Sequence, residues 1–315
     1  MSNRFFSFLT ERLWDIFCLF SIVGIYPRWI EPNLLTIQRY GMPIKNLSPS
    51  LKGLRIVQFS DLHFHQKSSQ WFLRRLSKKI NSLQADLLVF TGDFLCRSKL
   101  ESPEVLIEFL NSLQAKEGYF AILGNHDYAF PISRDQEGGY RIVEEEENLL
   151  LKGFKLLWKP KKNIPPKKIH AVPLHKKLLE LLKKTPFKLL HNETQTLFIK
   201  GEPISVCGLG EYMAGQCIPS LNSLHPLVVL LHNPDGVDLL KNMGADLILC
   251  GHTHGAQVNL PFIWKRLCDL EQPQFKRGLH HLENGYLYVN RGVGGLPKFR
   301  WFSIPEITVF ELEEA

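Results

Sequence analysis

Runs of apolar residues alternate with amphipathic stretches from Gly53 toward the C-terminal end of the chain. Leu54–Ser60 predicts a buried strand, Trp71–Leu83 has its apolar residues at helical spacing, and Asp86–Thr91 predicts the next strand. A strand, a helix and another strand in this order are typical of a βαβ unit. The pattern therefore predicts a domain with α/β layers.

The same alternation predicts further elements along the chain. Pro103–Leu113 is expected to be a helix with proline in its first turn, and Asp235–Met243 is expected to be another helix. The remaining apolar runs predict strands at Tyr119–Leu123, Ile204–Leu209, Leu227–Leu231, Asp246–Cys250, Tyr286–Asn290 and Ile307–Leu312. The chain shows no internal repeat, so we expect these elements to form one domain.

Residues 133–187 interrupt this alternation, and we interpret them as an insertion. They contain an acidic cluster at Glu144–Glu147 and two stretches rich in leucine and lysine, Leu149–Trp158 and Leu174–Lys184. The second stretch predicts a basic amphipathic helix, because its leucines recur at helical spacing with lysines between them. Such helices favour anionic membrane surfaces or acidic partners.

The N-terminal region holds an apolar run, Ile16–Tyr26, which is shorter than the roughly 20 residues that a membrane-spanning helix needs. Arginine and tryptophan side chains flank the run, as they do in membrane-surface anchors. Asp15 interrupts the apolar character, and no small-residue cleavage pattern follows, which argues against a signal peptide. We expect residues 1–50 to be a membrane-interfacial segment with a lead-in to a domain at 51–315. The alternative is a helix packed on the core of that domain.

Composition narrows the class of protein. The chain has 315 residues, of which 44% are hydrophobic and 22% are charged, so it is large enough for one sizeable core. These proportions exclude a disordered tail, a collagen and a coiled coil. The six cysteines are scattered without a C-x-x-C pair, so neither a disulfide framework nor a thiolate zinc site is expected. A reducing compartment fits this pattern.

The positive charge of the chain is local. The formal net charge is +7, but the stretch from Lys152 to Lys188 holds twelve lysines and a single acid, so the rest of the chain is net negative. A nucleic-acid surface would interleave arginine with aromatic residues, whereas this stretch combines lysine with leucine. We therefore expect an anionic membrane surface as the partner and no nucleic acid.

Acidic, amide and imidazole side chains follow five predicted strands at their C-terminal ends. They form the groups Asp61-Leu62-His63, Gly92-Asp93, Gly124-Asn125-His126-Asp127, His232-Asn233 and Gly251-His252-Thr253-His254. Ligands in open α/β sheets bind at this edge, so we expect the five groups to converge. The glycines that precede Asp93, Asn125 and His252 suit tight turns that aim the next side chain into a cleft.

The donor atoms of these groups indicate a metal site. Carboxylate, imidazole and amide donors without thiolate suit manganese, iron or zinc, and two ions are needed to use all of them. A pair of ions about 4 Å apart, bridged by one aspartate, generates hydroxide near neutral pH and holds the attacked phosphoryl oxygen. The pattern therefore predicts hydrolysis of a phosphoester.

The order D-x-H, GD, GNHD, H and GHTH resembles that of the calcineurin-like metallophosphoesterases from Gly53 to about Leu312. The resemblance implies a four-layer α-β-β-α sandwich of two mixed sheets with helices outside, here with a basic helical insertion. It implies that one ion is held by Asp61, His63, Asp93 and His254, and the other by Asp93, Asn125, His232 and His252. It also implies that His126, held by Asp127, faces the scissile phosphate and either stabilises the transition state or protonates the leaving group.

A narrower resemblance rests on fewer residues. The lead-in Glu31–Asn33 and the tail segments Asn290–Gly294 and Pro305–Ile307 resemble the membrane-associated branch of this family. The lysine-rich insertion is similar to that of the enzymes of lipid A synthesis that hydrolyse UDP-2,3-diacylglucosamine to UMP and 2,3-diacylglucosamine 1-phosphate. This implies a lipid-linked nucleotide substrate, two divalent ions with manganese expected before iron or zinc, and a peripheral or monotopic position on the cytoplasmic face of the inner membrane.

The insertion is the expected lid over the acyl chains of such a substrate. Trp158, Lys176, Lys177 and Arg291 are the residues that we expect to contact the substrate or form the lid. Two alternatives stay open. One is a membrane-associated phosphodiesterase or phosphatase that acts on another lipid or nucleotide, and the other is a non-catalytic scaffold, which the complete ligand set disfavours. No obligatory protein partner is evident in the sequence.

Overall fold

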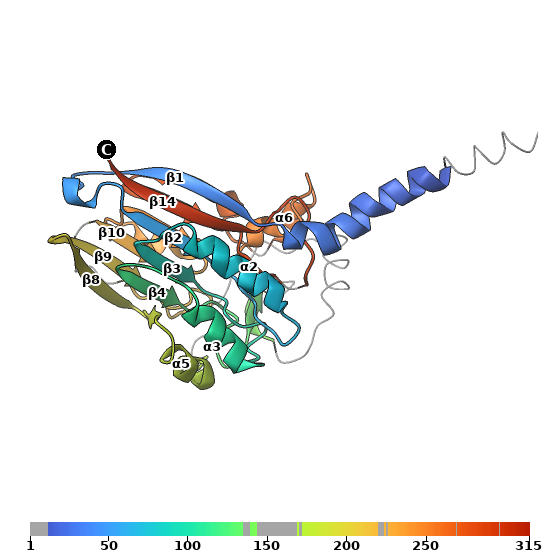
Figure 1. Cartoon of the computed structure of the whole chain (residues 1–315), viewed down its shortest axis with the longest axis horizontal. Coiled ribbons are helices and arrows are strands. Elements are labelled where there is room, and N and C mark those ends of the chain that lie inside the picture. Colours follow the sequence, from blue (N-terminus) through green and yellow to red (C-terminus); the bar gives the residue numbers. More distant parts are fainter. Residues whose placement is uncertain are drawn as a thin grey trace, which may run out of the picture.

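Two six-stranded sheets packed face to face form the body of the protein (Figure 1). The structure is a computed structural model, and it describes residues 12–134, 139–143, 169, 172–219, 224, 226–268, 270–295 and 297–315. The first sheet has the order β1 (Thr36–Ile44), β14 (Glu306–Glu314), β2 (Arg55–Phe59), β3 (Leu87–Thr91), β4 (Gly118–Ile122) and β7 (Lys188–Leu189). The second has the order β12 (Gly278–Leu282), β13 (Gly285–Val289), β11 (Leu247–Cys250), β10 (Leu227–Leu230), β9 (Glu202–Gly208) and β8 (Glu193–Ile199). A separate hairpin pairs β5 (Ile132–Arg134) with β6 (Tyr140–Ile142).

Alternate residues of each strand build the core between the sheets. In β3, Leu87 and Val89 pack toward the second sheet, where they meet residues such as Val228 of β10. Leu88 and Phe90 of the same strand belong to the separate core on the outer face of the first sheet. This period of two is that of a strand buried on both faces, which explains why the predicted strands read as continuous apolar runs.

Helices cover the outer face of the first sheet. They are α2 (Gln70–Asn81), α3 (Pro103–Asn111) and α5 (Lys176–Leu182) (Figure 1). In α2 the residues Leu73, Leu76 and Ile80 are buried at the spacing that the sequence predicts, and the Ser69 side chain accepts a hydrogen bond from the Phe72 backbone N–H at 3.3 Å. The expected α/β sandwich is confirmed.

The helix expected at Asp235–Met243 is present against the second sheet as the 3₁₀ segment η4 (Pro234–Leu240). It ends at Leu240, earlier than expected, and Gly236 within it disfavours a longer α-helix. Shorter pieces complete the described chain: η3 (Pro49–Leu51), η5 (His254–Ala256), α6 (Trp264–Leu267) and η6 (Pro273–Phe275).

The basic amphipathic helix predicted in the insertion is present as α5. Its leucines Leu178, Leu181 and Leu182 are buried in the core on the outer face of the first sheet. The apolar face of α5 is therefore not available to a membrane, contrary to the expectation, although Lys176 and Lys177 remain exposed. The other predicted stretch, Leu149–Trp158, lies outside the described residues.

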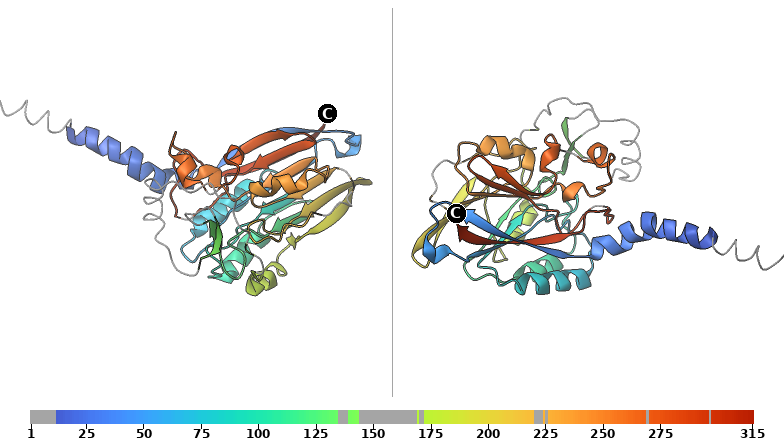
Figure 2. Two further views of the ribbon diagram at one scale, coloured as in Figure 1. Left: turned by 180° about the vertical axis from the view of Figure 1, so that it is seen from behind. Right: turned by 90° about the horizontal axis from the view of Figure 1, so that it is seen from above.

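A continuous helix of 22 residues, Arg12–Asn33, precedes the domain and projects away from it (Figures 1 and 2). It includes the π-helical segment η1 (Ser21–Ile30), which contains Pro27, and the 3₁₀ turn η2 (Glu31–Asn33). By length and composition this helix could cross a membrane, so the expectation that the apolar run is too short is corrected. Only 6% of its most apolar window is buried, which contradicts the alternative of a helix packed on the core.

Hydrogen bonds fix the end of this N-terminal helix to the C-terminal part of the domain. The buried Glu31 carboxylate accepts hydrogen bonds from the backbone N–H groups of Phe302, at 2.9 Å, and Ser303. The Arg28 guanidinium donates to the Lys298 carbonyl at 2.9 Å. After this junction the chain enters β1, which pairs in parallel with β14 over its whole length. The lead-in within residues 1–50 is thus part of the first sheet.

Candidate metal centre

The C-terminal ends of five strands meet at one edge of the two sheets. In the first sheet β2, β3 and β4 run parallel, and in the second sheet β10 and β11 run parallel. Backbone bonds join the loops that follow them, from Asp61 N–H to the Gly92 carbonyl at 2.9 Å and from Gly251 N–H to the His232 carbonyl at 3.0 Å. The convergence predicted from the strand ends is therefore present.

Buried hydrogen bonds connect the two sheets at this edge. The Gln58 side chain donates to the Cys250 carbonyl at 2.9 Å, and the backbone N–H of His252 donates to Asp61 Oδ1 at 3.0 Å. His232 Nδ1 lies 2.6 Å from the Thr91 carbonyl, which can only accept. His232 therefore carries a proton on Nδ1 and presents Nε2 to the centre.

Asp61, His63 and His254 form the first cluster of donor atoms. Their ligand atoms lie within 4.8 Å of one another, and the Nε2 atoms of His63 and His254 are 2.9 Å apart. Arg300 Nη2 lies 3.2 Å from His254 Nδ1 and also bonds the carbonyls of Gly292 and Gly294. Asp61 Oδ1 lies 3.6 Å from His254 Nε2, so the cluster offers one oxygen and two nitrogen donor atoms to a cation.

Asp93 stands between the first cluster and a second one. Its Oδ2 lies 3.4 Å from His63 Nε2 and 3.3 Å from His232 Nε2. Asn125 Oδ1 lies 3.2 Å from His232 Nε2 and 2.9 Å from His252 Nδ1. The Asn125 amide nitrogen donates to the Ile132 carbonyl at 2.7 Å, which directs the amide oxygen toward the cluster. One carboxylate thus faces ligand atoms on both sides, as a bridging ligand would.

The backbone at this edge is strained. Five of the seven expected ligands have a left-handed backbone, with φ of 52° at Asp61, 45° at His63, 63° at Asp93, 70° at His252 and 50° at His254. For residues with a Cβ, such a conformation costs roughly 1–2 kcal/mol each. Strain of this kind persists only where the surrounding structure holds it, and it commonly marks functional sites.

Close approach explains the glycines that precede the ligands. A Cβ on Gly124 would lie 2.3 Å from Asp93 Oδ1, and one on Gly251 would lie 2.0 Å from Ser60 Oγ. At Gly92 the backbone φ is +94° and a Cβ would lie 2.5 Å from His232 Nδ1. From the sequence we expected these glycines to form tight turns. The structure shows in addition that neighbouring atoms leave no room for a larger residue at these positions.

Burial of so many ionisable groups shifts their pKa values. Burial lowers the pKa of His63 and of His252 to about 3, and burial raises the pKa of Asp61 to about 7. Despite burial, the adjacent Asp93 carboxylate holds the pKa of His232 well above its ordinary value. Burial disfavours the charged form of His63, His252 and Asp61, whereas the charge of Asp93 favours the charged form of His232. Buried carboxylate, amide and imidazole donors at this spacing fit divalent cations, which would offset these costs.

The structure differs from the expectation on how His126 is held. The Asp127 carboxylate accepts hydrogen bonds from the backbone N–H groups of Phe94, Leu95 and Gly124, at 2.9–3.0 Å, and no contact of this carboxylate with the His126 ring is among those described. The expectation that Asp127 holds the His126 ring is therefore corrected. Asp127 instead joins the loop after β3 to the loop after β4.

The His126 ring is oriented by backbone groups. Its Nδ1 accepts a hydrogen bond from the Arg97 backbone N–H at 3.1 Å, and its own backbone N–H donates to Asp93 Oδ1 at 2.9 Å. Because Nδ1 accepts, the proton of the neutral ring lies on Nε2. His126 stands beside the cluster, with its ring centre 4.8 Å from that of His63. This arrangement presents an N–H donor at the edge of the centre.

The four expected substrate contacts remain predictions. Trp158 lies outside the described residues, and Lys176 and Lys177 are exposed on the first turn of α5. The Arg291 guanidinium is paired with Glu306 at 2.5 Å and bonds the Thr36 hydroxyl at 3.2 Å. Those contacts give Arg291 a structural role in joining β1 to β14.

Sequence reasoning did not identify three buried polar residues around the centre. Arg300, at 1% exposure, contacts His254, while Gln58 and Glu31 join segments that are far apart in the sequence. Gln58 offered a usable signal, because it is a polar residue within an apolar strand. Arg300 lies outside the five motifs and offered no signal, while Glu31 belongs to the lead-in Glu31–Asn33 that carries the narrower resemblance, which did not indicate its contact with Phe302.

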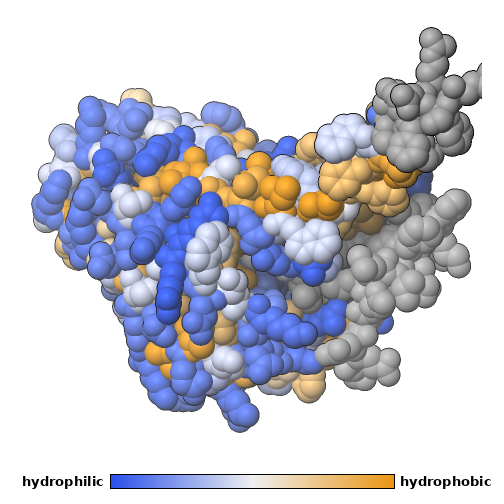
Figure 3. All heavy atoms as spheres, turned by 45° about the vertical axis from the view of Figure 1, so that its right-hand side comes forward, coloured by the Kyte–Doolittle hydropathy of each residue, from blue (hydrophilic) through white to orange (hydrophobic). Residues whose placement is uncertain are grey.

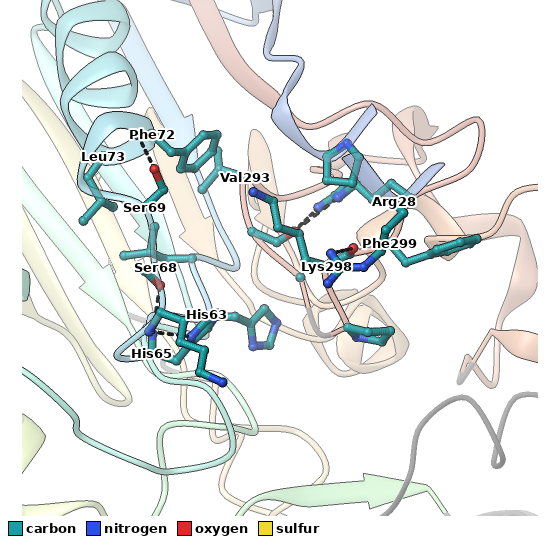
Figure 4. A pocket seen from close by; sticks show the side chains of 17 residues that line it. Arg28, His63, His65, Ser68, Ser69, Phe72, Leu73, Val293, Lys298 and Phe299 are labelled. Carbon is teal, nitrogen blue, oxygen red and sulfur yellow. Dashed lines mark hydrogen bonds between the residues drawn. The ribbon is translucent and has the colours of Figure 1, made fainter. Parts of the chain in front are cut away.

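A pocket opens beside the metal centre, between the N-terminal helix and α2 (Figure 4). Its volume is about 240 Å³. The residues that line it are Arg28, Pro32, Leu62, His63, His65, Lys67, Ser68, Ser69, Phe72, Leu73, Val293, Gly294, Gly295, Pro297, Lys298, Phe299 and Arg300. His65, which the motifs left without a role, lies at this pocket. His63 belongs both to the pocket wall and to the first cluster of donor atoms.

Comparison with known proteins adds to this geometry. A family model described as calcineurin-like phosphoesterase matches residues 54–256. The UDP-2,3-diacylglucosamine pyrophosphatase of Chlamydia muridarum is 40% identical over 306 residues, which cover 91% of this chain and 92% of that protein. The protein of the same name from Chlamydia trachomatis is 38% identical over 317 residues, with 95% of each chain covered. A phosphodiesterase of Escherichia coli is 25% identical over 291 residues, which cover 91% of this chain and 92% of that protein.

Proposed function

Because the chain belongs to the calcineurin-like phosphoesterase family and is a hydrolase of that family, we propose that it hydrolyses the diphosphate bridge of UDP-2,3-diacylglucosamine. The observation that carries the proposal is the similarity to two pyrophosphatases of this specificity, at 40% and 38% identity over more than nine-tenths of the chain. The reaction adds water across one P–O–P bridge and gives UMP and 2,3-diacylglucosamine 1-phosphate. Both products are the same whichever phosphorus is attacked.

The proposal includes two divalent cations at the clustered donor atoms. Asp61, His63 and His254 would hold one, Asn125, His232 and His252 the other, and Asp93 would be shared. Such cations supply charge neutralisation at the phosphoryl oxygens and a more acidic water, and manganese, iron and zinc all accept these donors. Among the three we propose manganese, because carboxylate and amide oxygens suit manganese and the thiolate donors that favour zinc are absent from the set.

His126 is the proposed catalytic side chain. Its Nδ1 is occupied by the Arg97 N–H, so Nε2 offers a proton to an oxygen of the substrate. Burial lowers the pKa of His126, which keeps the ring neutral near pH 7. In this role His126 donates a hydrogen bond to the phosphate as charge develops there. Asp127 has an indirect role as a positioning residue, because its carboxylate joins the two loops that carry Asp93 and His126.

The N-terminal helix gives the enzyme access to a lipid substrate. Its apolar side chains are exposed, and Figure 3 shows hydrophobic atoms gathered where the helix meets the domain. The helix and the relatives of lipid A synthesis together indicate membrane association. We propose that the domain lies on the cytoplasmic side, because the nucleotide part of the substrate is water-soluble and the cysteines suit a reducing compartment.

A second function has one observation in its favour. The E. coli relative, at 25% identity, is described as a phosphodiesterase, and the same metal centre would serve a different lipid or nucleotide diester. The higher identity of the two pyrophosphatases favours the first proposal.

The test is direct. Purified protein is incubated with UDP-2,3-diacylglucosamine and manganese, with and without a chelator, and the products are identified by mass spectrometry. Release of UMP and the sugar 1-phosphate only in the presence of metal supports the proposal. Hydrolysis of bis(p-nitrophenyl) phosphate without any release of UMP would favour the second function.

A further inference from the structure

We infer that the pocket between the N-terminal helix and α2 receives an acyl chain of the lipid substrate and holds it beside the metal centre. This inference rests on the proposed function, because it assigns one part of the proposed substrate to one site. It also differs from the sequence-based expectation, which assigned the acyl chains to a lid formed by residues 133–187.

The position of the pocket is the first argument. Its inner wall includes His63, an expected metal ligand (Figure 4). The wall also includes Arg300, which contacts His254. Its outer wall includes Arg28 and Pro32 at the end of the N-terminal helix. A molecule in the pocket would therefore touch the metal centre at one end and the base of the apolar helix at the other.

The chemistry of the lining is the second argument. Apolar side chains form much of the wall, namely Leu62, Phe72, Leu73, Val293 and Phe299. The charged residues among the described lining are all basic, and no aspartate or glutamate is among them. An apolar wall with cationic groups fits an amphiphile that carries a phosphate, since the chain gains from burial and the phosphate from the positive charge.

The hydroxyl groups of the pocket help to identify which part of the substrate binds. Ser68 Oγ accepts a hydrogen bond from the His65 backbone N–H at 3.0 Å, and Ser69 Oγ accepts one from the Phe72 backbone N–H at 3.3 Å. Each hydroxyl therefore keeps its own O–H, but the described lining offers no carboxylate or amide side chain to accept a hydrogen bond from the ring N–H of a uracil base. An acyl chain needs no such acceptor, so the lipid end of the substrate suits the pocket better than the nucleotide end.

The junction with the helix provides a route from the membrane. Trp29 and Ile30, beside Arg28, are 61% and 46% exposed, and the Arg28 guanidinium lies 5.7 Å from the centre of the Trp29 ring. Tryptophan and arginine at a helix end are typical of the membrane–water interface. The pocket mouth is therefore at the depth of the headgroups, where a lipid could enter without its chains crossing water.

Kinetics with substrates of different chain length test the inference. Phe72→Asp places a charge in the apolar wall, and Phe198→Asp, on β8 and 69% exposed, is the matched control. We measure kcat/KM for UDP-diacylglucosamine with long and with short acyl chains. For Phe72→Asp the ratio of long-chain to short-chain kcat/KM should fall about tenfold or more, with no such fall in the control. Phe299→Asp replaces it if Phe72→Asp fails to fold. An unchanged ratio would overturn the inference.

A binding measurement separates this inference from the proposed function. Phosphatidic acid with a photoreactive group on one acyl chain is cross-linked to the full chain in detergent, and labelled peptides are mapped. We expect label in 62–73 and 293–299, reduced by Phe72→Asp and by added substrate. If the wild type releases no UMP but this labelling occurs, the proposed function fails and the lipid pocket stands. If UMP is released while label falls elsewhere, or is not displaced by substrate, the pocket does not hold the substrate chain.

Discussion

At the metal centre, buried carboxylates and imidazoles lie on loops whose backbone is left-handed at five ligands, whereas the wall of the adjoining pocket combines apolar with basic side chains. The centre is fixed by hydrogen bonds from backbone groups of both sheets. The pocket is completed by the N-terminal helix, which is outside the region matched by the family model. The difference indicates that the donor atoms of the centre lie in the part of the chain that the family model matches, while the pocket depends in part on segments outside it.

Asp93→Asn should have the largest effect, because the carboxylate faces both clusters. We expect kcat to fall about 10³-fold or more for a lipid substrate and for a small diester alike, with loss of bound metal measured by elemental analysis. Asp238→Asn, an exposed aspartate of η4, is the control. If the variant kept its activity to within tenfold of the wild type, hydrolysis would not depend on Asp93, and the assignment of the chemical step to the metal centre would be wrong.

His126→Gln should give the next largest loss of activity. The side chain is expected to contribute to the chemical step without holding a cation, so kcat should fall about 10²–10⁴-fold while the metal content stays that of the wild type. Both measurements are made on one preparation. A parallel loss of metal would contradict the assignment, and His126 would then be a ligand, since its ring also lies within reach of Asp93 and His63.

Removal of residues 1–24 should weaken membrane binding without affecting hydrolysis of a soluble substrate. The shortened protein keeps Pro27, Arg28 and Glu31, which bond the domain, but it loses most of the exposed apolar helix. We expect sedimentation with anionic vesicles to be lost and turnover of vesicle-embedded substrate to fall about tenfold. Hydrolysis of a soluble diester serves as the control. Sedimentation that persists would locate the membrane contact elsewhere.

Glu211→Gln should give the smallest effect, and it tests whether burial of acids near the centre lowers stability. Burial raises the pKa of Glu211 to about 7. Between the ordinary pKa and pH 7 the folded state therefore holds a proton that the unfolded state has released, so stability falls as pH rises through this window. From pH 6 to pH 7 the wild type should lose about 1 kcal/mol relative to the variant, measured by urea unfolding in chelator. If the free energy of unfolding of the wild type and of the variant changed in parallel with pH, the raised pKa of Glu211 would be refuted.

The strand ends and their ligands could be predicted from the sequence because both signals are local. An apolar run followed by Gly-Asp or Gly-Asn-His-Asp identifies a strand and its loop, and parallel pairing then brings the loops to one edge. The left-handed backbone at Asp61 or His254 could not be predicted, since it depends on contacts between the two sheets. The pairing of His232 with Asp93 follows from the same convergence.

The remaining features depend on contacts between distant parts of the chain. Arg28 bonds Lys298 and Glu31 bonds Phe302, and no local pattern links these positions. The apolar run Ile16–Tyr26 did not reveal the length of the N-terminal helix, because the helix continues past the run and accommodates Pro27 in a π-helical segment. The helical period of α5 was predictable, but not that its leucines pack on the protein itself.

The direct passage from the N-terminal helix into β1 has a mechanical consequence. The helix end is bonded to the domain at Glu31, and β1 then pairs with β14 from Thr36 to Ile44, so the connection has little freedom to swivel. A body joined through a flexible tether would tumble above the bilayer and present its active site to the lipid only part of the time. Here the orientation of the domain would be set by the tilt of its own helix.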